Sequence, residues 1–199
     1  MLKLTTPRRV AALMVASAAT ASLAAAPAEA AKTVTTRGGD EFKPNEYVRS
    51  SHRFAPGRIV VRPNERVTWV DRDFTRDPHT ITVLTRRNVP NTLGELFNCQ
   101  ACALAFAHLE DPNDPNSPLA RERVNVGKAG MNTQGDSLYM RNRGRVSARI
   151  TAGVGRTLHY LCGIHPWMQG TIRVTRTGTR PQAAAGVGGG GAGLAGRTR

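Results

Sequence analysis

The chain has 199 residues, with 28 Lys and Arg against 14 Asp and Glu, and a formal net charge of +14 at pH 7. This length suits one domain with a single core, flanked by segments that do not pack. We interpret the positive charge as a solvated basic surface; the alternative is attraction to acidic partners, anionic wall polymers or lipid headgroups. Because no basic stripe interleaves with aromatic residues, the composition argues against a nucleic-acid partner.

The first 30 residues are typical of a signal peptide. Lys3, Arg8 and Arg9 precede an Ala-rich apolar run, and Ala-Glu-Ala at 28–30 is a small-x-small cleavage site. The apolar run is short for a transmembrane helix, so we predict cleavage after Ala30 and export to an extracellular, wall-associated or periplasmic location. The general and twin-arginine export routes both stay open, since paired arginines are common in basic leader starts.

After a predicted N-terminal extension at 31–52, residues 53–176 show the pattern of an all-β domain. Strands are predicted at 58–62, 66–70, 80–84, 145–150, 157–161 and 170–175, where β-branched residues run or alternate with polar ones. Several short strands separated by Gly and Pro turns indicate a β-sandwich. The last segment, 177–199, is rich in Gly and Ala and is predicted to be a flexible tail.

The middle of the domain, about 88–135, lacks sustained alternation and is predicted to be an inserted, partly helical segment. Residues 96–109 are rich in Ala with Leu and Phe, which favours a helix. The Asp-, Asn- and Pro-rich stretch at 111–118 lacks the residue order of a calcium-binding EF-hand loop, and turn chemistry explains it.

One thiol, one imidazole and one thioether recur at three-residue steps near the end of the domain, as Cys162, His165 and Met168. A second imidazole, His79, lies far upstream. A thiolate, two imidazoles and a thioether are the ligands that hold one copper ion in a trigonal plane with a weak axial Met. Each residue alone has an ordinary role in a core or on a surface. Their combination and spacing predict a mononuclear copper site.

With these residues in view, the chain resembles cupredoxins of the plastocyanin and amicyanin group. The resemblance covers 53–84, which contains Pro-His-Thr at 78–80, and 145–174, which contains the short loop Cys-x-x-His-Pro-x-Met at 162–168. It implies a Greek-key β-sandwich with blue type 1 copper at one end and a role in electron transfer.

The resemblance also implies a role for each donor. Cys162 would be the anionic in-plane ligand, deprotonated by the metal. His79 and His165 would bind as neutral imidazoles, and Met168 would be the weak axial ligand. The chain departs from the family in its inserted segment and in Asp71, which stands where the family often has Asn.

Three residues beside the donors carry further expectations. The backbone N–H of Thr80, at the position where plastocyanin has Asn, is our candidate donor to the thiolate, since Pro166 has no N–H. In the relatives, the loop histidine reaches the surface through an apolar patch. Here His165, Pro166 and Trp167 would form that electron port.

The neighbours of Cys162 argue against enzymes that contain such centres. Multicopper oxidases and copper nitrite reductases place His beside the Cys, and a dinuclear centre needs two Cys in the loop; neither pattern occurs. We therefore predict a monomeric electron carrier without substrate turnover, whose partners are redox proteins, acidic ones among them. The alternative is copper storage, trafficking or resistance. Proteins with those roles usually have Met- or His-rich tracts, whereas the five Met and five His here are scattered.

A second pair of thiols, Cys99 and Cys102, lies in the inserted segment. For an exported chain the leading interpretation is a local disulfide. A redox-active dithiol, or a second metal site that includes His108, are the alternatives. His52 and His159 are interpreted as surface or packing residues.

Overall fold

The structure, a computed structural model, describes residues 32–75, 77–114 and 116–178. The predicted signal peptide, its cleavage site and residues 179–199 of the predicted tail lie outside these residues. No helix in the described ranges is long and apolar enough to cross a membrane.

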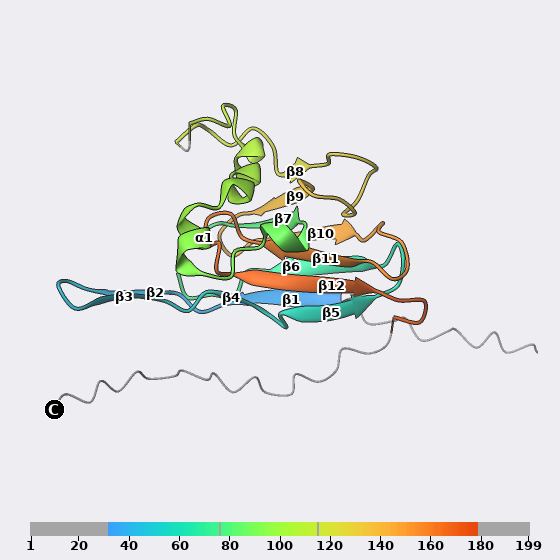
Figure 1. The fold of residues 1–199 in the computed structure, drawn as a ribbon, viewed down its shortest axis with the longest axis horizontal. Coiled ribbons are helices and arrows are strands. Elements are labelled where there is room, and N and C mark those ends of the chain that lie inside the picture. Colours follow the sequence, from blue (N-terminus) through green and yellow to red (C-terminus); the bar gives the residue numbers. More distant parts are fainter. Residues whose placement is uncertain (1–31, 76, 115, 179–199) are drawn as a thin grey trace, which may run out of the picture. The chain divides into compact units, whose positions relative to one another are not determined.

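Two β-sheets form the body of the domain (Figure 1). Their strands are β1 (Lys32–Arg37), β4 (Arg53–Ala55), β5 (Arg58–Val61), β6 (Arg66–Val70), β7 (His79–Leu84), β8 (Arg123–Val124), β9 (Ser137–Met140), β10 (Arg145–Arg149), β11 (Thr157–Leu161) and β12 (Gln169–Val174). One sheet has the order β10-β6-β1-β4, and the other has the order β5-β12-β11-β7-β9-β8. The pairs β1–β6 and β5–β12 are parallel and the others antiparallel. The described chain is therefore a β-sandwich, as its strand pattern predicts.

Aromatic side chains from both sheets meet in the core. Trp69 on β6 and Phe54 on β4 contact the ring of Tyr160 on β11, with centroids 5.9 Å and 4.9 Å apart. Gly170 on β12 makes room for that ring, because a Cβ there would lie 2.3 Å from Tyr160 Cζ. Buried and less buried positions alternate along β5, β11 and β12, so these strands each turn one side toward this core.

The sandwich begins at β1 and not at residue 53, where the sequence pattern placed its start. β1 lies between β6 and β4, and Val34 is completely buried. The expected extension was wrong because Lys32–Arg37 contains only one aliphatic residue, while a threonine, Thr36, fills another buried position. Residues 40–50 form a separate hairpin of β2 (Asp40–Lys43) and β3 (Tyr47–Ser50).

The segment predicted to be helical contains a short α-helix and a 3-10 helix. They are α1 (Leu93–Phe97) and η2 (Gln100–His108), which follow the single turn η1 (Arg86–Asn88). Thr92 and Glu95 form a capping box that fixes the start of α1. Beyond these helices, β8 and β9 extend the six-stranded sheet.

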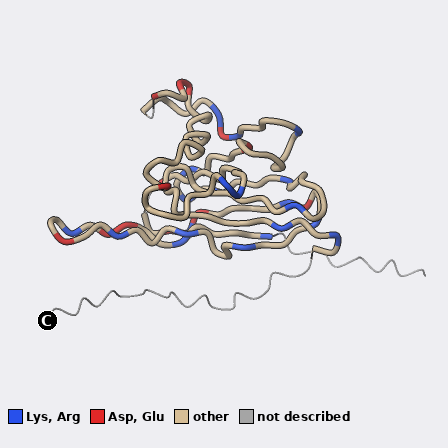
Figure 2. The backbone as a smooth tube through the Cα atoms, viewed as in Figure 1, with Lys and Arg blue, Asp and Glu red and all other residues tan. Residues whose placement is uncertain are grey.

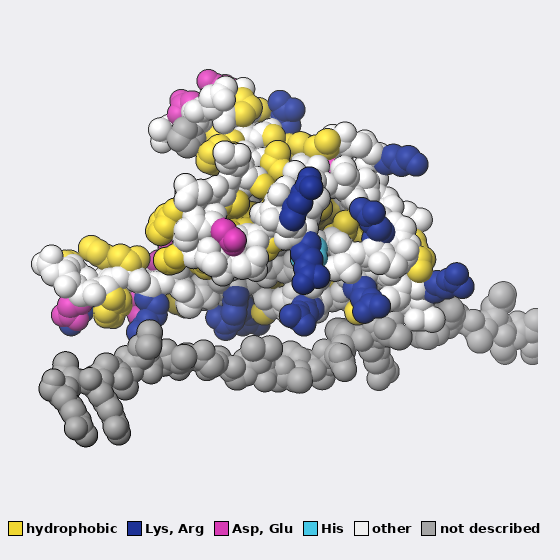
Figure 3. Space-filling model, in the orientation of Figure 1, with side chains coloured by type: hydrophobic (Ala, Val, Ile, Leu, Met, Phe, Trp, Pro, Cys, Tyr) yellow, Lys and Arg dark blue, Asp and Glu magenta, His cyan; other side chains and the backbone are white. Residues whose placement is uncertain are grey.

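Charge and apolar surface are distributed unevenly. Lys and Arg residues are spread over the strands, while acidic residues gather on the β2–β3 hairpin together with basic ones (Figure 2). Hydrophobic side chains cover parts of the hairpin and of the face near α1 (Figure 3). The most exposed of these are Phe42, Val48, Leu93 and Phe97.

Candidate metal centre

The four predicted donors come from one strand end and one loop of the six-stranded sheet. His79 begins β7, and Cys162 directly follows β11, which pairs with β7 in antiparallel register. The loop from Cys162 to Met168 leads into β12. It closes on itself, because Cys162 N–H donates to Met168 O (3.0 Å) and Met168 N–H donates to His165 O (2.8 Å). Pairing of β7 with β11 thus brings donors far apart in sequence to one end of the sheet.

The sulfur and the two imidazoles have the separations of ligands that share an ion. Cys162 Sγ lies 3.7 Å from His79 Nδ1 and 3.7 Å from His165 Nδ1. Sulfur and nitrogen bound to one ion at about 2.3 Å and 2.0 Å, with about 120° between them, are roughly 3.7 Å apart. Cys162, His79 and Met168 are fully buried, and His165 is 6% exposed. The donor set therefore fits a soft metal ion in a site closed to water.

The thiol of Cys162 needs a cation to become a thiolate. Burial raises its pKa, and hydrogen bonds from the backbone and hydroxyl of Thr80 oppose this rise. The Thr80 N–H, the donor expected from the sequence, lies 3.3 Å from Sγ. A metal ion would supply the positive charge that displaces the proton.

Both histidines are prepared to bind through Nδ1. His79 Nε2 bonds to the carboxylate of Asp73 at 2.5 Å, which assigns the proton to Nε2 and leaves Nδ1 as the acceptor facing Cys162. Burial first, and then the neighbouring His52 and His79, lower the pKa of His165 to about 4, against the opposing effect of Asp40 and Asp77. His165 is therefore a neutral imidazole near pH 7.

The side chain of Thr80 ties β7 to the ligand loop. Its Oγ1 accepts hydrogen bonds from Gly163 N–H (2.7 Å) and from the hydroxyl of Thr82 (3.1 Å). Gly163 in turn lies tightly against η2, since a Cβ at Gly163 would be 2.2 Å from Ala105 Cβ. The helical segment thus covers the loop that carries Cys162.

Both carboxylate oxygens of Asp71, which stands where the family often has Asn, accept hydrogen bonds. One oxygen accepts from the Thr36 hydroxyl (2.5 Å) and from Asp73 N–H (3.2 Å), and the other accepts from Arg143 N–H (2.6 Å). An amide would turn one of these acceptors into a donor. Asp71 holds the start of the loop that brings Asp73 to His79.

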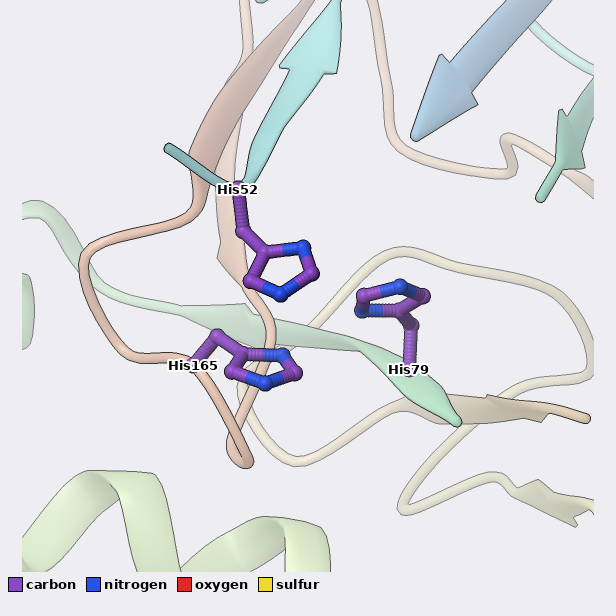
Figure 4. A group of neighbouring side chains, drawn as sticks. All are labelled: His52, His79 and His165. Carbon is purple, nitrogen blue, oxygen red and sulfur yellow. The ribbon is translucent and has the colours of Figure 1, made fainter. Parts of the chain in front are cut away.

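His52, interpreted from the sequence as a surface or packing residue, lies directly against the donors. Its ring stacks on His165 with centroids 4.3 Å apart and meets the edge of His79 at 5.5 Å (Figure 4). Of the residues predicted to form an electron port, His165 thus lies beneath His52. Pro166 is partly buried, and Trp167 is 41% exposed with its ring 5.6 Å from that of His165. No spacing motif marks His52, so sequence reasoning had no signal for it.

The remaining cysteines form a pair of their own. Cys99 and Cys102 are joined by a disulfide. His108, considered as a companion ligand for them, instead bonds to Ser137 Oγ (2.8 Å) and to the carbonyl of Arg121 (2.9 Å). These contacts give His108 a structural role on the inner side of η2.

No protein-family model matches the chain, and no curated protein sequence matches it. Solved structures that resemble it include a purple cupredoxin from Nitrosopumilus maritimus, at 15% identity and a TM-score of 0.37, with 72% of this chain and 99% of that one covered. A reduced auracyanin from Roseiflexus castenholzii has 14% identity and a TM-score of 0.38, with 73% and 98% covered. An amicyanin mutant has 17% identity and a TM-score of 0.33, with 74% and 84% covered. At these scores the likeness adds nothing to the functional case, which rests on the residues of the site.

Proposed function

We propose that the chain is a mononuclear copper protein that carries electrons. His79, Cys162 and His165 would hold the ion, with Met168 of the same loop as the fourth proposed donor. The observation that carries the proposal is the pair of 3.7 Å separations from one buried sulfur to two imidazole nitrogens. Copper would supply a one-electron couple between Cu(II) and Cu(I).

The residues around the donors support this role because they keep the site fixed. Asp73 orients His79, and Thr80 bonds both to the sulfur and to the loop at Gly163. A site whose donors stay in place in both oxidation states has little to reorganise when an electron arrives. Burial of the donors also leaves little room for a substrate, so we propose an electron carrier rather than an enzyme.

Several finer features belong to the same proposal. We propose blue type 1 copper, Greek-key connections between the strands, and an insertion at about 88–135 relative to plastocyanin-like proteins. We also propose an exported monomer whose partners are redox proteins. The leader composition at 1–30 supports export, and the ligand loop at 162–168 supports blue copper.

A copper reconstitution experiment tests the function. The protein loaded with Cu(II) should contain one copper per chain and show an intense band at roughly 600 nm from charge transfer between sulfur and copper. The band should disappear and return on reversible one-electron reduction and reoxidation. Cys162→Ser should abolish the band. His159→Gln, which changes a histidine on β11 outside the donor set, should leave it unchanged.

Two other outcomes would contradict the proposal in different ways. A chain that binds one copper only as colourless Cu(I), and resists oxidation, would favour copper storage or trafficking. A chain that binds no copper, with Cys162 intact and reduced, would exclude both functions.

A further inference from the structure

The side chain of His52 is fully buried, yet neither of its ring nitrogens makes a hydrogen bond among the described residues; Asp73 Oδ2 lies 3.4 Å from Nδ1 without bonding to it. Leaving a buried polar group without a partner costs about 1–3 kcal/mol. Proteins rarely keep such a group unless a ligand, an ion or a water satisfies it. The surroundings of His52 indicate which of these fits.

Two carboxylates approach one nitrogen of His52. Asp40 Oδ2 lies 3.5 Å and Asp77 Oδ2 lies 3.8 Å from His52 Nε2. These separations are too long for good hydrogen bonds. They match donors that share a metal ion, because two atoms bound at roughly 2.0–2.2 Å with 110–120° between them are about 3.3–3.8 Å apart. The ligand atoms of Asp40, His52, Asp77 and His165 also lie within 4.8 Å of one another.

The stacking of His52 on His165 separates this group from the copper site. An imidazole lone pair lies in the plane of its ring. The two rings are stacked, with centroids 4.3 Å apart and only 25° between their planes. Their lone pairs therefore lie in nearly parallel planes and do not converge on one ion. An ion bound at His52 would therefore be a second ion, on the side of His52 away from that stack; Figure 4 shows the ring of His52 lying against that of His165.

We propose that His52, Asp40 and Asp77 form a second cation site for a divalent first-row metal ion such as Zn²⁺. One imidazole and two carboxylates suit such ions. Both carboxylate side chains are nearly half exposed, at 44% and 45%, so the ion has an entry path and a position for water. Two carboxylates also compensate its charge. The proposal rests on the proposed copper function, because it places this ion beside a ligand of the copper site.

The ion would have two consequences for the protein. Asp40 begins the β2–β3 hairpin and Asp77 precedes β7, so an ion bound between them would fix the hairpin to the sandwich. A positive charge beside His165 also favours the reduced form of the copper centre, which carries one more electron. Binding should therefore raise the reduction potential.

A zinc titration of the copper-loaded chain tests the proposal. Metal analysis after dialysis should find one zinc per chain in addition to copper, with the visible band retained and the reduction potential raised. The double variant Asp40→Asn/Asp77→Asn should bind zinc at least about tenfold more weakly, a difference of about 1.4 kcal/mol. Glu41→Gln is a control on the same hairpin: it removes one charge, against two in the double variant, and should bind zinc as the wild type does.

Three results would overturn the second site. Zinc could displace copper and abolish the band, it could fail to bind, or it could bind equally to the double variant and to the Glu41→Gln control. A failure of the copper function is visible beforehand, as a missing band before zinc is added. In that case the titration is repeated in the Cys162→Ser background, where the same loss in Asp40→Asn/Asp77→Asn relative to Glu41→Gln is required.

Discussion

Replacing Thr80 by Val tests how the ligand loop is held. The substitution keeps the shape and the backbone N–H toward Cys162 but removes Oγ1, which accepts from Gly163 N–H at 2.7 Å and from Thr82 at 3.1 Å. Thr82 keeps Ser137 as a partner at 2.8 Å, and Cys162 loses the Thr80 hydroxyl but keeps the Thr80 N–H at 3.3 Å, so the group left without a partner is Gly163 N–H. A fully buried donor left unpaired costs about 1–3 kcal/mol; because Gly163 is only partly buried, we expect a loss near the lower end, about 1 kcal/mol, in the free energy of unfolding.

Urea unfolding of the copper-free chain measures this loss, and hydrogen exchange at the Gly163 amide shows whether the bond itself has gone. Thr80→Ser is the control, because it keeps the hydroxyl and removes one buried methyl for about 0.8 kcal/mol. Gly163 should lose its protection in the Val variant and keep it in the Ser variant. A Val variant within about 0.5 kcal/mol of wild type, with Gly163 still protected, would refute the reasoning.

Three further predictions concern the surroundings of the site. Gly163→Ala should cost about 1–3 kcal/mol in urea unfolding through its clash with Ala105, and Ala105→Gly should recover part of that loss in the double variant. Asp71→Asn should lower the free energy of unfolding by about 1–3 kcal/mol, because the NH₂ group of Asn would face either Arg143 N–H or the Thr36 and Asp73 donors. An unchanged unfolding midpoint would contradict this. Burial lowers the pKa of His108 below its ordinary 6.5, so the unfolded chain binds more protons as the pH falls below about 6.5. The contribution of His108 to the free energy of unfolding should therefore be fully present above that pH and should be lost as the pH falls below it. In thermal melts from pH 7 to pH 4.5, the melting temperature of His108→Gln should fall less steeply than that of the wild type.

The strands that the sequence predicted well are those whose burial relies on aliphatic side chains. β6, β11 and β12 alternate apolar with polar residues, so the period of two is visible in the letters, and β5 is a short run of β-branched residues. β1 escaped prediction because threonine fills one of its buried positions and bonds there to Asp71. The β2–β3 hairpin escaped because nearly all of its residues are exposed, so no apolar face marks it.

Part of the candidate site could likewise be predicted from residues close together in the sequence, and part could not. Cys162, His165 and Met168 lie within one loop, so their spacing is readable directly. The contact of Asp73 with His79 and the position of His52 depend on how separate loops meet at the end of the sandwich. Such contacts follow from tertiary packing, and no periodicity in a single sequence encodes them.

The short loop from Cys162 to Met168 has a consequence for metal loading. Three of the four proposed donors, Cys162, His165 and Met168, lie within this loop. The fourth, His79, is 83 residues from Cys162 in the sequence and joins them only when β7 pairs with β11. The denatured polypeptide can therefore chelate soft ions through this heptapeptide alone. Because binding to the denatured ensemble offsets binding to the native one, added copper should raise the melting temperature by less than its native-state affinity implies. Trace metal present during refolding would likewise engage this heptapeptide before the sheet has closed.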